Sequence, residues 1–274
     1  MNKISTSFAN RIGTQLGFII AVTRTETKKA IRSKLFWITL IGMVLVPLML
    51  SVLMYIKKYP ELTNNSILTT KASMIPGNAD WPTYISLCAQ ILVGTGMFAF
   101  AFVVSWLFGR EHTDRTLKDL LALPLPRWSF VTGKFVVMVI WCILLFFVSA
   151  TAALVAGALL HLDNWSSAFA VRSLQDFTAG IAMAIWLNML IALVAAWSGG
   201  YLAAIGAAVV ALLLGNFIEM LGLGYYYPWY ITMAYASDGL QGIYPGAVSI
   251  IIVIVSGLAG FAGTIFCWRY ADQT

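Results

Sequence analysis

Long apolar runs alternate with short polar segments along the whole chain. Six of these runs reach the roughly 20 residues that a helix needs to cross the hydrocarbon core of a bilayer. The runs are continuous and lack the period-two alternation of barrel strands, so we predict six transmembrane helices. Their predicted bounds are 35–55, 84–108, 131–160, 177–197, 200–220 and 246–268.

The composition agrees with an all-α, polytopic membrane protein. Of 274 residues, 60% are apolar or aromatic and 10% are charged, whereas about a quarter of the residues of a soluble domain are charged. Soluble globules and disordered chains both require many more polar residues. The net charge of +6 does not indicate a nucleic-acid partner, because most of the chain lacks the charges that a basic face requires.

The basic residues predict that both termini are cytoplasmic. Seven precede the first span, five lie between the second and third spans or at the start of the third, and one follows the sixth. The opposite side has four, and cytoplasmic loops carry the excess of Lys and Arg. The first 34 residues contain no cleavable apolar core. We expect residues 15–34 to form an interfacial helix that presents Arg24, Lys28 and Arg32 to anionic membrane lipids.

The predicted membrane interior is poor in polar side chains. Ion-coupled transporters keep ionisable groups at this depth, and here Glu219 is the clear candidate. Two asparagines and two mid-membrane tryptophans are the other notable groups. Packing or an interfacial position explains each of them as well as a transport role does. The candidate substrate-pathway residues are Trp141, Trp186, Asn188, Asn216 and Glu219.

No catalytic or metal-binding pattern emerges from the sequence. His112 and His161 are far from any credible nucleophile, and the three cysteines are isolated within spans. Ser198-Gly199 is interpreted as a tight turn between two helices. No phosphate-binding loop motif occurs, so ATP would have to be bound by another chain. We predict no catalytic residue, no metal site and no directly bound cofactor.

One polar segment, residues 109–127, interrupts the apolar pattern between the second and third spans. Leu117, Leu120 and Leu121 recur at helical spacing. Acidic and basic residues pair at i,i+4, as in Glu111 with Arg115, and Pro124 ends the pattern. We predict an amphipathic helix over 110–123. It either lies on the inner lipid surface or docks its leucines into a groove of a cytoplasmic partner.

This segment resembles the first cytoplasmic loop of type-2 ABC exporter permeases, such as the bacitracin and lantibiotic exporters. The resemblance rests on Glu111, Arg115-Thr116-Leu117, residues 120–124, Arg127 and Gly133-Lys134-Phe135. Many relatives have a small residue where this chain has Arg115. In that family the loop forms a coupling helix that sits in a cleft of the ATPase subunit.

The resemblance implies partners and interface residues. The partners are a nucleotide-binding ATPase subunit, which would hold ATP and Mg²⁺, and a second permease copy or a paralogue. Arg127 and Lys134 are expected to anchor the loop at the membrane surface. The expected ATPase-interface residues are Glu111, Asp114, Arg115, Leu117, Lys118, Leu120 and Leu121.

Two further segments have packing interpretations. Residues 221–244 are rich in Gly, Pro and aromatic side chains. The resemblance implies a re-entrant helical pair at the outer mouth, and an ordinary interfacial loop is the alternative. In the sixth span, small residues recur every fourth position at Ser256, Gly260 and Thr264, and in the fifth at Ala203 and Ala207. Such faces allow helices to pack closely, within the chain or between chains.

The chain is expected to form one transmembrane permease domain over residues 1–274, in the cytoplasmic membrane of a bacterium. The expected function is that of the permease subunit of an ATP-driven ABC exporter, which moves an amphipathic substrate such as a peptide antibiotic or a lipid-like molecule. Two alternatives remain open from the residues. One is a non-transporting membrane anchor or immunity subunit, and the other is an integral-membrane enzyme or an ion-coupled carrier.

Overall fold

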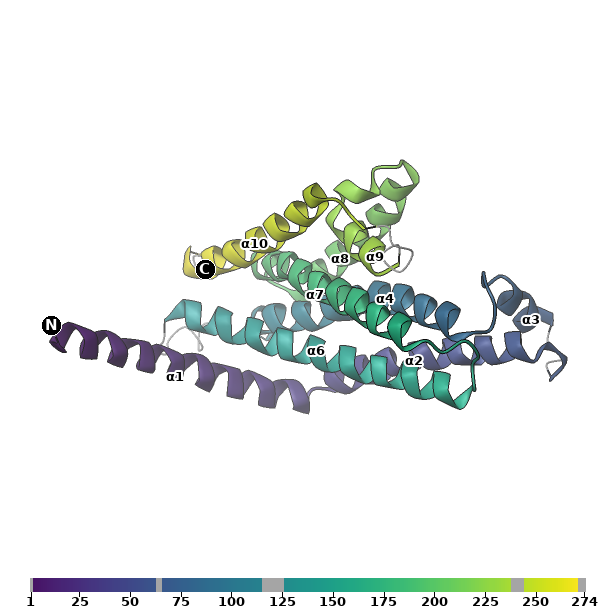
Figure 1. Ribbon diagram of the computed structural model, residues 1–274. Helices are drawn as coiled ribbons and strands as arrows, with labels where there is room; N and C mark the ends of the chain where they lie inside the picture. The colour runs from purple at the N-terminus through teal and green to yellow at the C-terminus, as the bar shows by residue number, and fades with distance from the viewer. Residues whose placement is uncertain (1, 63–65, 115–125, 238–243, 271–274) are drawn as a thin grey trace.

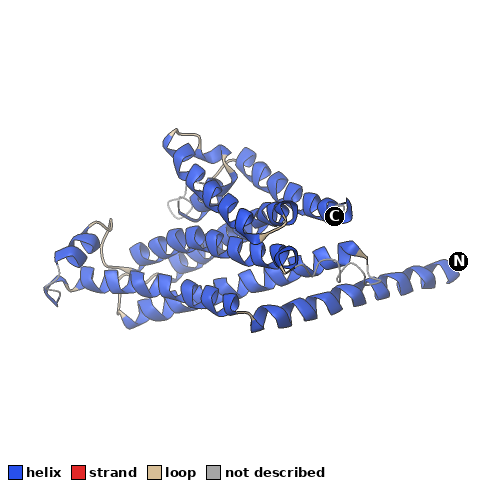
Figure 2. Ribbon diagram, turned by 180° about the vertical axis from the view of Figure 1, so that it is seen from behind, coloured by secondary structure: helices blue, strands red, loops and turns tan. Residues whose placement is uncertain are grey.

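The computed structural model describes residues 2–62, 66–114, 126–237 and 244–270. In that part of the chain every regular element is a helix (Figure 2). The shorter elements are η1 (Pro60–Leu62), α3 (Ser66–Ser73), η2 (Gly224–Tyr226) and α9 (Pro228–Ser237). The longer helices are α1 (Asn2–Arg32), α2 (Lys34–Lys58), α4 (Trp81–Thr113), α6 (Arg127–Leu159), α7 (Ser167–Ser198), α8 (Tyr201–Met220) and α10 (Ala247–Tyr270).

Six helices of the described residues are long and apolar enough to cross a membrane, namely α2, α4, α6, α7, α8 and α10. This confirms the predicted number of spans. The helices are longer than several predicted runs, most of all α7, which begins at Ser167 rather than at Phe177. Ser166 caps α7 by accepting a hydrogen bond from the Phe169 N–H at 3.4 Å. The helix therefore starts at its capping residue, ahead of the apolar run.

Helices α2, α4, α6 and α7 lie side by side along the long axis of the molecule (Figure 1). Helix α7 also packs against α8, α9 and α10, which lie together on one side of the bundle. The described ends of the chain lie toward the same end of the bundle as the start of α6 (Figure 1). We call this the loop end, because α4 ends and α6 begins there, and the opposite end, where α3 lies, the far end.

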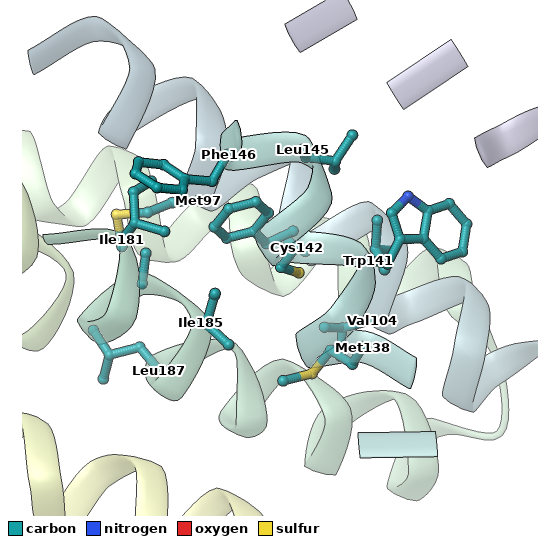
Figure 3. Packing of buried hydrophobic residues seen from close by; sticks show 14 of the residues in the cluster. Met97, Val104, Met138, Trp141, Cys142, Leu145, Phe146, Ile181, Ile185 and Leu187 are labelled. Carbon is teal, nitrogen blue, oxygen red and sulfur yellow. The ribbon is translucent and has the colours of Figure 1, made fainter. Parts of the chain in front are cut away.

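The centre of the bundle is filled by apolar side chains from α4, α6 and α7. Met138, Cys142 and Leu145 of α6 are fully buried, and Met138 lies beside Val104 of α4 (Figure 3). Close packing of these side chains holds the three helices at fixed positions. The core therefore provides a rigid frame between the two ends of the bundle.

Helix α10 is joined to α7 through small residues, which we call the glycine seam: Gly257, Gly260, Gly263 and Thr264. A Cβ atom on Gly260 would lie 2.5 Å from the backbone of Met189 and Leu190. The buried Thr264 hydroxyl donates to the Gly260 carbonyl of its own helix at 2.7 Å. The predicted close packing at small residues of the last span is confirmed, within the chain.

The turn between α7 and α8 has the tight form expected for Ser198-Gly199. Gly199 adopts the left-handed conformation with φ of 67°, which glycine allows without a steric penalty. In α8 the buried small face consists of Ala204, Ala208 and Ala211. Ala203 is exposed and Ala207 is half-buried, so the face that packs within this chain is one residue away from the predicted one.

Helix α1 extends past the bundle at the loop end (Figure 1) and spans Asn2–Arg32 rather than 15–34. Its described side chains show two faces. Val22, Glu26 and Ala30 recur at i,i+4 and are buried as α1 packs on α6. Arg24 and Lys28 lie exposed between them in sequence. The face predicted to be basic is therefore free of contacts with the bundle.

Candidate functional site

The predicted coupling segment is only partly described. Helix α4 continues without a break through Gly109 and ends at Thr113, so residues 110–113 are the last turn of α4 and not the start of a separate helix. Pro126, with φ of −61°, directly precedes α6 as its N-cap residue. Glu111 and Asp114 are described. The other predicted interface residues lie outside the described residues: Arg115, Leu117, Lys118, Leu120 and Leu121.

Buried charges join the two helices that flank this segment. Lys134 of α6 is fully buried, and its Nζ lies 2.8 Å from Oε1 of Glu111, which is 1% exposed. The Lys134 ammonium also donates to the Leu107 carbonyl of α4. Because Lys134 is enclosed by the chain, the expectation that it anchors the loop at the membrane surface is wrong. The side chain of Glu111 likewise lies inside the chain and pairs with Lys134.

Two more charges complete this group. Oε2 of Glu26, on α1, lies 3.5 Å from Nζ of Lys134 and 3.6 Å from the Arg110 guanidinium. Arg110 also lies 3.4 Å from Glu111 and stacks over the ring of Trp106, 4.3 Å from its centroid. We call Glu26, Arg110, Glu111 and Lys134 the charge cluster. Two carboxylates and two cations balance within it, as buried charges require.

The Glu26 carboxylate stays ionised at this position. Burial by itself raises its pKa, and the positive charges of Lys134, Lys29 and Arg110 outweigh that effect and hold the pKa below its ordinary value. Lys29, which is partly exposed, donates to Oε1 of Glu26 at 2.7 Å. Glu26 is therefore charged at neutral pH and connects the cluster to α1.

Two glycines bring the backbones together around the charge cluster. A Cβ on Gly133 of α6 would lie 2.6 Å from the Val22 side chain of α1. A Cβ on Gly109 of α4 would lie 2.5 Å from the backbone nitrogen of Tyr201, in the turn between α7 and α8. The ends of α4 and α6 are thus packed against α1 on one side and the α7–α8 turn on the other.

The spacing of Glu26 along α1 is a signal of its burial that hydropathy alone does not show. Glu26 lies in a basic segment, where an acidic residue is easily taken for a surface partner of its neighbours. Its i,i+4 spacing with Val22 and Ala30 instead places it on the buried stripe. A single acid on an apolar helical stripe predicts a buried basic partner.

The proposed substrate-pathway residues do not meet in one place. Trp141 is buried in the core, between Phe36 and Trp106, at ring-centroid distances of 5.3 and 5.9 Å. Asn188 is also buried, and its Nδ2 donates to the Ala184 carbonyl one turn earlier in α7. Trp186 lies between α7 and α10, where its Nε1 donates to the Ile254 carbonyl at 3.2 Å. All three occupy packing positions within the chain.

The two remaining candidates lie together on α8. Asn216 and Glu219 are exposed near the end of that helix. Asn216 donates to its own helix at Leu212, and Glu219 accepts from the Tyr230 hydroxyl at 3.4 Å. Both side chains therefore face the surroundings of the chain and not its interior.

A buried carboxylate near the far end was missed by the sequence analysis. Asp176 of α7 is 6% exposed and accepts from the Tyr244 hydroxyl, at 3.1 Å to its nearer oxygen. Arg172, one turn earlier, lies 3.5 Å from the same hydroxyl. Asp176 directly precedes the predicted fourth span, so its position just outside the apolar run concealed its burial.

The described part of residues 221–244 packs into the bundle. Helix α9 contacts α7, α4 and α8, and Ile231, Thr232 and Ala236 on it are buried. A Cβ on Gly180 of α7 would lie 3.1 Å from that of Ala236. Residues 238–243 lie outside the described residues, so the helical pair stays a prediction.

The described residues contain no group of three His, Cys, Asp or Glu side chains that could hold a metal ion. The cysteines are free, with Cys88 and Cys142 buried and Cys267 half-buried. Among the described groups, the features that stand out from apolar packing are the charge cluster at the loop end and the Asp176–Tyr244 contact.

Comparison with known proteins adds a family to this geometry. A family model described as "ABC-2 family transporter protein" matches residues 22–215, from the second half of α1 to near the end of α8. The Bacitracin transport permease protein BCRB of Bacillus licheniformis is 26% identical over 190 residues, which cover 69% of this chain and 91% of that protein. The matched part includes the whole charge cluster. With its six apolar helices, the chain belongs to the ABC-2 family and is the membrane subunit of an ABC transporter.

Proposed function

We propose that this chain is the permease of an ATP-driven exporter in the cytoplasmic membrane of a bacterium. A separate nucleotide-binding subunit would bind ATP and Mg²⁺ and dock against residues 110–123. Its closure would be passed through the α4–α6 segment to the spans. The substrate would be an amphipathic molecule, and a peptide antibiotic is the first choice because the relative above is named as a bacitracin transport permease.

The observation that carries this proposal is the construction of the loop end in a member of the ABC-2 family. The segment between α4 and α6 holds a leucine stripe and paired charges. Both of its ends are fixed in the bundle by a fully buried lysine and its carboxylate partners. A simple connector on a lipid surface does not require buried ion pairs at its base. A segment that receives force from a partner does require fixed ends.

A second permease is proposed from the uneven burial of the spans. About three fifths of the apolar windows of α4 and α7 are buried within the chain (61%), against 17% for α8 and 22% for α10. Asn216 and Glu219 lie on the open surface of α8, and a carboxylate that faces lipid is costly. A second copy or a paralogue that covers this surface would remove that cost.

The decisive experiment is co-purification with an ABC-type ATPase subunit from the same organism. The wild-type permease should retain that subunit in detergent and in nanodiscs. Substitution of both Leu120 and Leu121 by Asp should remove it, because the leucine stripe is the proposed docking surface. The matched control replaces the same two residues by Met, which keeps their volume and apolarity, and should retain the subunit.

Two results would contradict the proposal at different points. A wild-type permease that retains no ATPase subunit would reject the exporter function in favour of an anchor or immunity subunit. ATP-driven bacitracin export at wild-type rate by the double Asp variant would reject the docking surface alone.

A further inference from the structure

Helix α1 has one charged connection to the rest of the bundle in the part whose side chains are described. Among residues 16–32, Glu26 alone forms ion pairs with other helices, to Arg110 of α4 and Lys134 of α6. The other buried residues on its stripe, Val22 and Ala30, make apolar contacts. Apolar contacts allow sliding and rotation far more readily than a fixed pair of charges does.

The two connections made by Lys134 differ in length. Its contact with Glu111 is 2.8 Å, which is a charge-assisted hydrogen bond. Its contact with Glu26 is 3.5 Å, and Oε2 of Glu26 has no hydrogen-bond partner. N–H···O hydrogen bonds are about 2.7–3.2 Å long. The link between α4 and α6 is therefore tight, and the link to α1 has room to shorten.

Burial strengthens the attraction between Glu26 and Lys134 although they lie 3.5 Å apart. Glu26 is 3% exposed and Lys134 is fully buried. Opposite charges in such a place attract more strongly than at a surface, because water and salt do not screen them. A displacement of either α4 or α6 at the loop end therefore changes the force on Glu26 directly.

A force on Glu26 is passed along the chain to the start of α2. Helix α1 ends at Arg32 and α2 begins at Lys34, with Ser33 as the cap between them. Whatever moves Glu26 also moves the start of the first span. The same span contacts both α4 and α6 deeper in the bundle.

We propose that the charge cluster is a positioning joint through which α1 moves together with the α4–α6 segment, so that the start of α2 follows the docking segment when the ATPase subunits close. Glu26 is the positioning residue of this joint. The inference rests on the proposed function for its driving force. The mechanical link itself is a property of the permease alone.

The test measures the link as a distance distribution between two spin labels. One label is placed at position 28 on the exposed face of α1 and one at position 113 at the end of α4, in a background with Cys267 replaced by Ser. The permease is measured in lipid nanodiscs by pulsed electron resonance, alone, with the ATPase subunit, and with that subunit trapped by ATP and vanadate. Neither label replaces a residue of the charge cluster or one of the docking leucines Leu117, Leu120 and Leu121.

The wild type should give one narrow distribution whose centre is the same in all three states. Glu26→Gln should widen the distribution about twofold in the permease alone, because several positions of α1 become populated. In the complex its centre should also shift on nucleotide trapping. Arg24→Gln, on the exposed face of the same helix, is the matched control and should behave as the wild type.

A third variant distinguishes the effect of the charge of Glu26 from the effect of its side-chain volume. Glu26→Asp keeps the charge and loses volume, so it should return most of the narrow distribution, whereas a purely packing role for Glu26 predicts that Asp is worse than Gln. If Glu26→Gln does not fold, Arg110→Gln interrupts the same link from α4 and should widen the distribution in the same way.

The proposed joint would be rejected if the Glu26→Gln variant gave the same distance distribution as the wild type, with and without the ATPase subunit. Failure of the wild-type permease to retain the ATPase subunit would instead reject the proposed function, and the width measured in the permease alone would still decide whether Glu26 holds α1.

Discussion

The charge cluster and the glycine seam join helices in opposite ways. At the loop end, α1, α4 and α6 meet through four charged side chains at separations of 2.8–3.6 Å. Along the seam, α10 meets α7 because glycines let the two backbones touch. Close packing dominates the seam, beside one hydrogen bond from Trp186 to the Ile254 carbonyl, and an added Cβ at Gly260 would meet the backbone of α7. The cluster depends on the balance of charges, so changes that keep the shape still affect it.

The largest expected effect is at the centre of the charge cluster. Lys134→Met keeps most of the side-chain volume and leaves the carboxylates of Glu26 and Glu111 buried without this cation. Loss of one member of a buried ion pair costs about 3–5 kcal/mol. The melting temperature of the purified permease in detergent should fall accordingly. Lys28→Met, on the exposed face of α1, should change the stability by less than about 0.5 kcal/mol, and equal melting temperatures would contradict the role given to Lys134.

The next effect should come from the glycine seam. Gly260→Ala places a Cβ against the backbone of α7, which cannot move aside as a flexible side chain could. Overpacking of this kind costs about 1–3 kcal/mol. Gly206→Ala is the control, since nothing lies within 4 Å of its added Cβ. The control should be neutral or stabilising by up to about 1 kcal/mol. A seam variant as stable as the control would show that α10 does not pack this closely.

Tyr244→Phe tests a charged contact that is more open to its surroundings than the cluster. It removes the hydroxyl that donates to Asp176 and leaves the ring in place. Tyr244 is 43% exposed, so the cost should be about 1 kcal/mol, below that of Lys134→Met. The loss of stability is measured by comparing the thermal unfolding of this variant with that of the wild type. A loss as large as that at Lys134 would show that burial is not what distinguishes the two charged sites.

The smallest effect is the pH dependence of the link to α1. The pKa of Glu26 is lowered in the folded protein, so its stabilising contribution is complete above the ordinary carboxyl pKa. That contribution is lost as the pH falls through the lowered value. The wild type should be more stable than Glu26→Gln at pH 7, because Lys134 and Arg110 keep a second carboxylate partner. The difference should start to decline below pH 4.5 and disappear only below the lowered pKa of Glu26, and a difference that persists in stronger acid would rule out the carboxylate charge as its source.

The number of spans could be predicted from the sequence, because a membrane helix is defined by its apolar side chains and hydropathy measures these directly. The ends of the spans could not, since charged residues buried inside the bundle look like loop residues in the sequence. Arg110 and Glu111 mark the predicted end of the second span, yet α4 passes through them because Lys134 and Glu26 neutralise them from other helices. Asp176 is concealed in the same way by Tyr244.

In the candidate site, too, local sequence patterns were predictable and contacts between distant residues were not. The docking segment proposed between α4 and α6 rests on a local pattern of leucines and paired charges in the sequence, and its docking role stays a prediction. The charge cluster beside this segment pairs Glu26 with Lys134, which lies more than 100 positions later in the chain. No local pattern predicts such a pairing. Trp141 and Asn188 are buried in the bundle, where Trp141 packs on Phe36 and Asn188 donates to its own helix, and their role in a substrate pathway stays a prediction.

The order of the charge cluster along the chain has a consequence for biogenesis. Glu26, Arg110 and Glu111 are all synthesised before Lys134, and chains enter the membrane from their N-terminus as synthesis proceeds. When the third span arrives, both carboxylates that receive its buried ammonium are already in place. The first three spans can therefore close into a charge-neutral unit before α7 is made, and the translocon would not have to shelter an unpaired lysine.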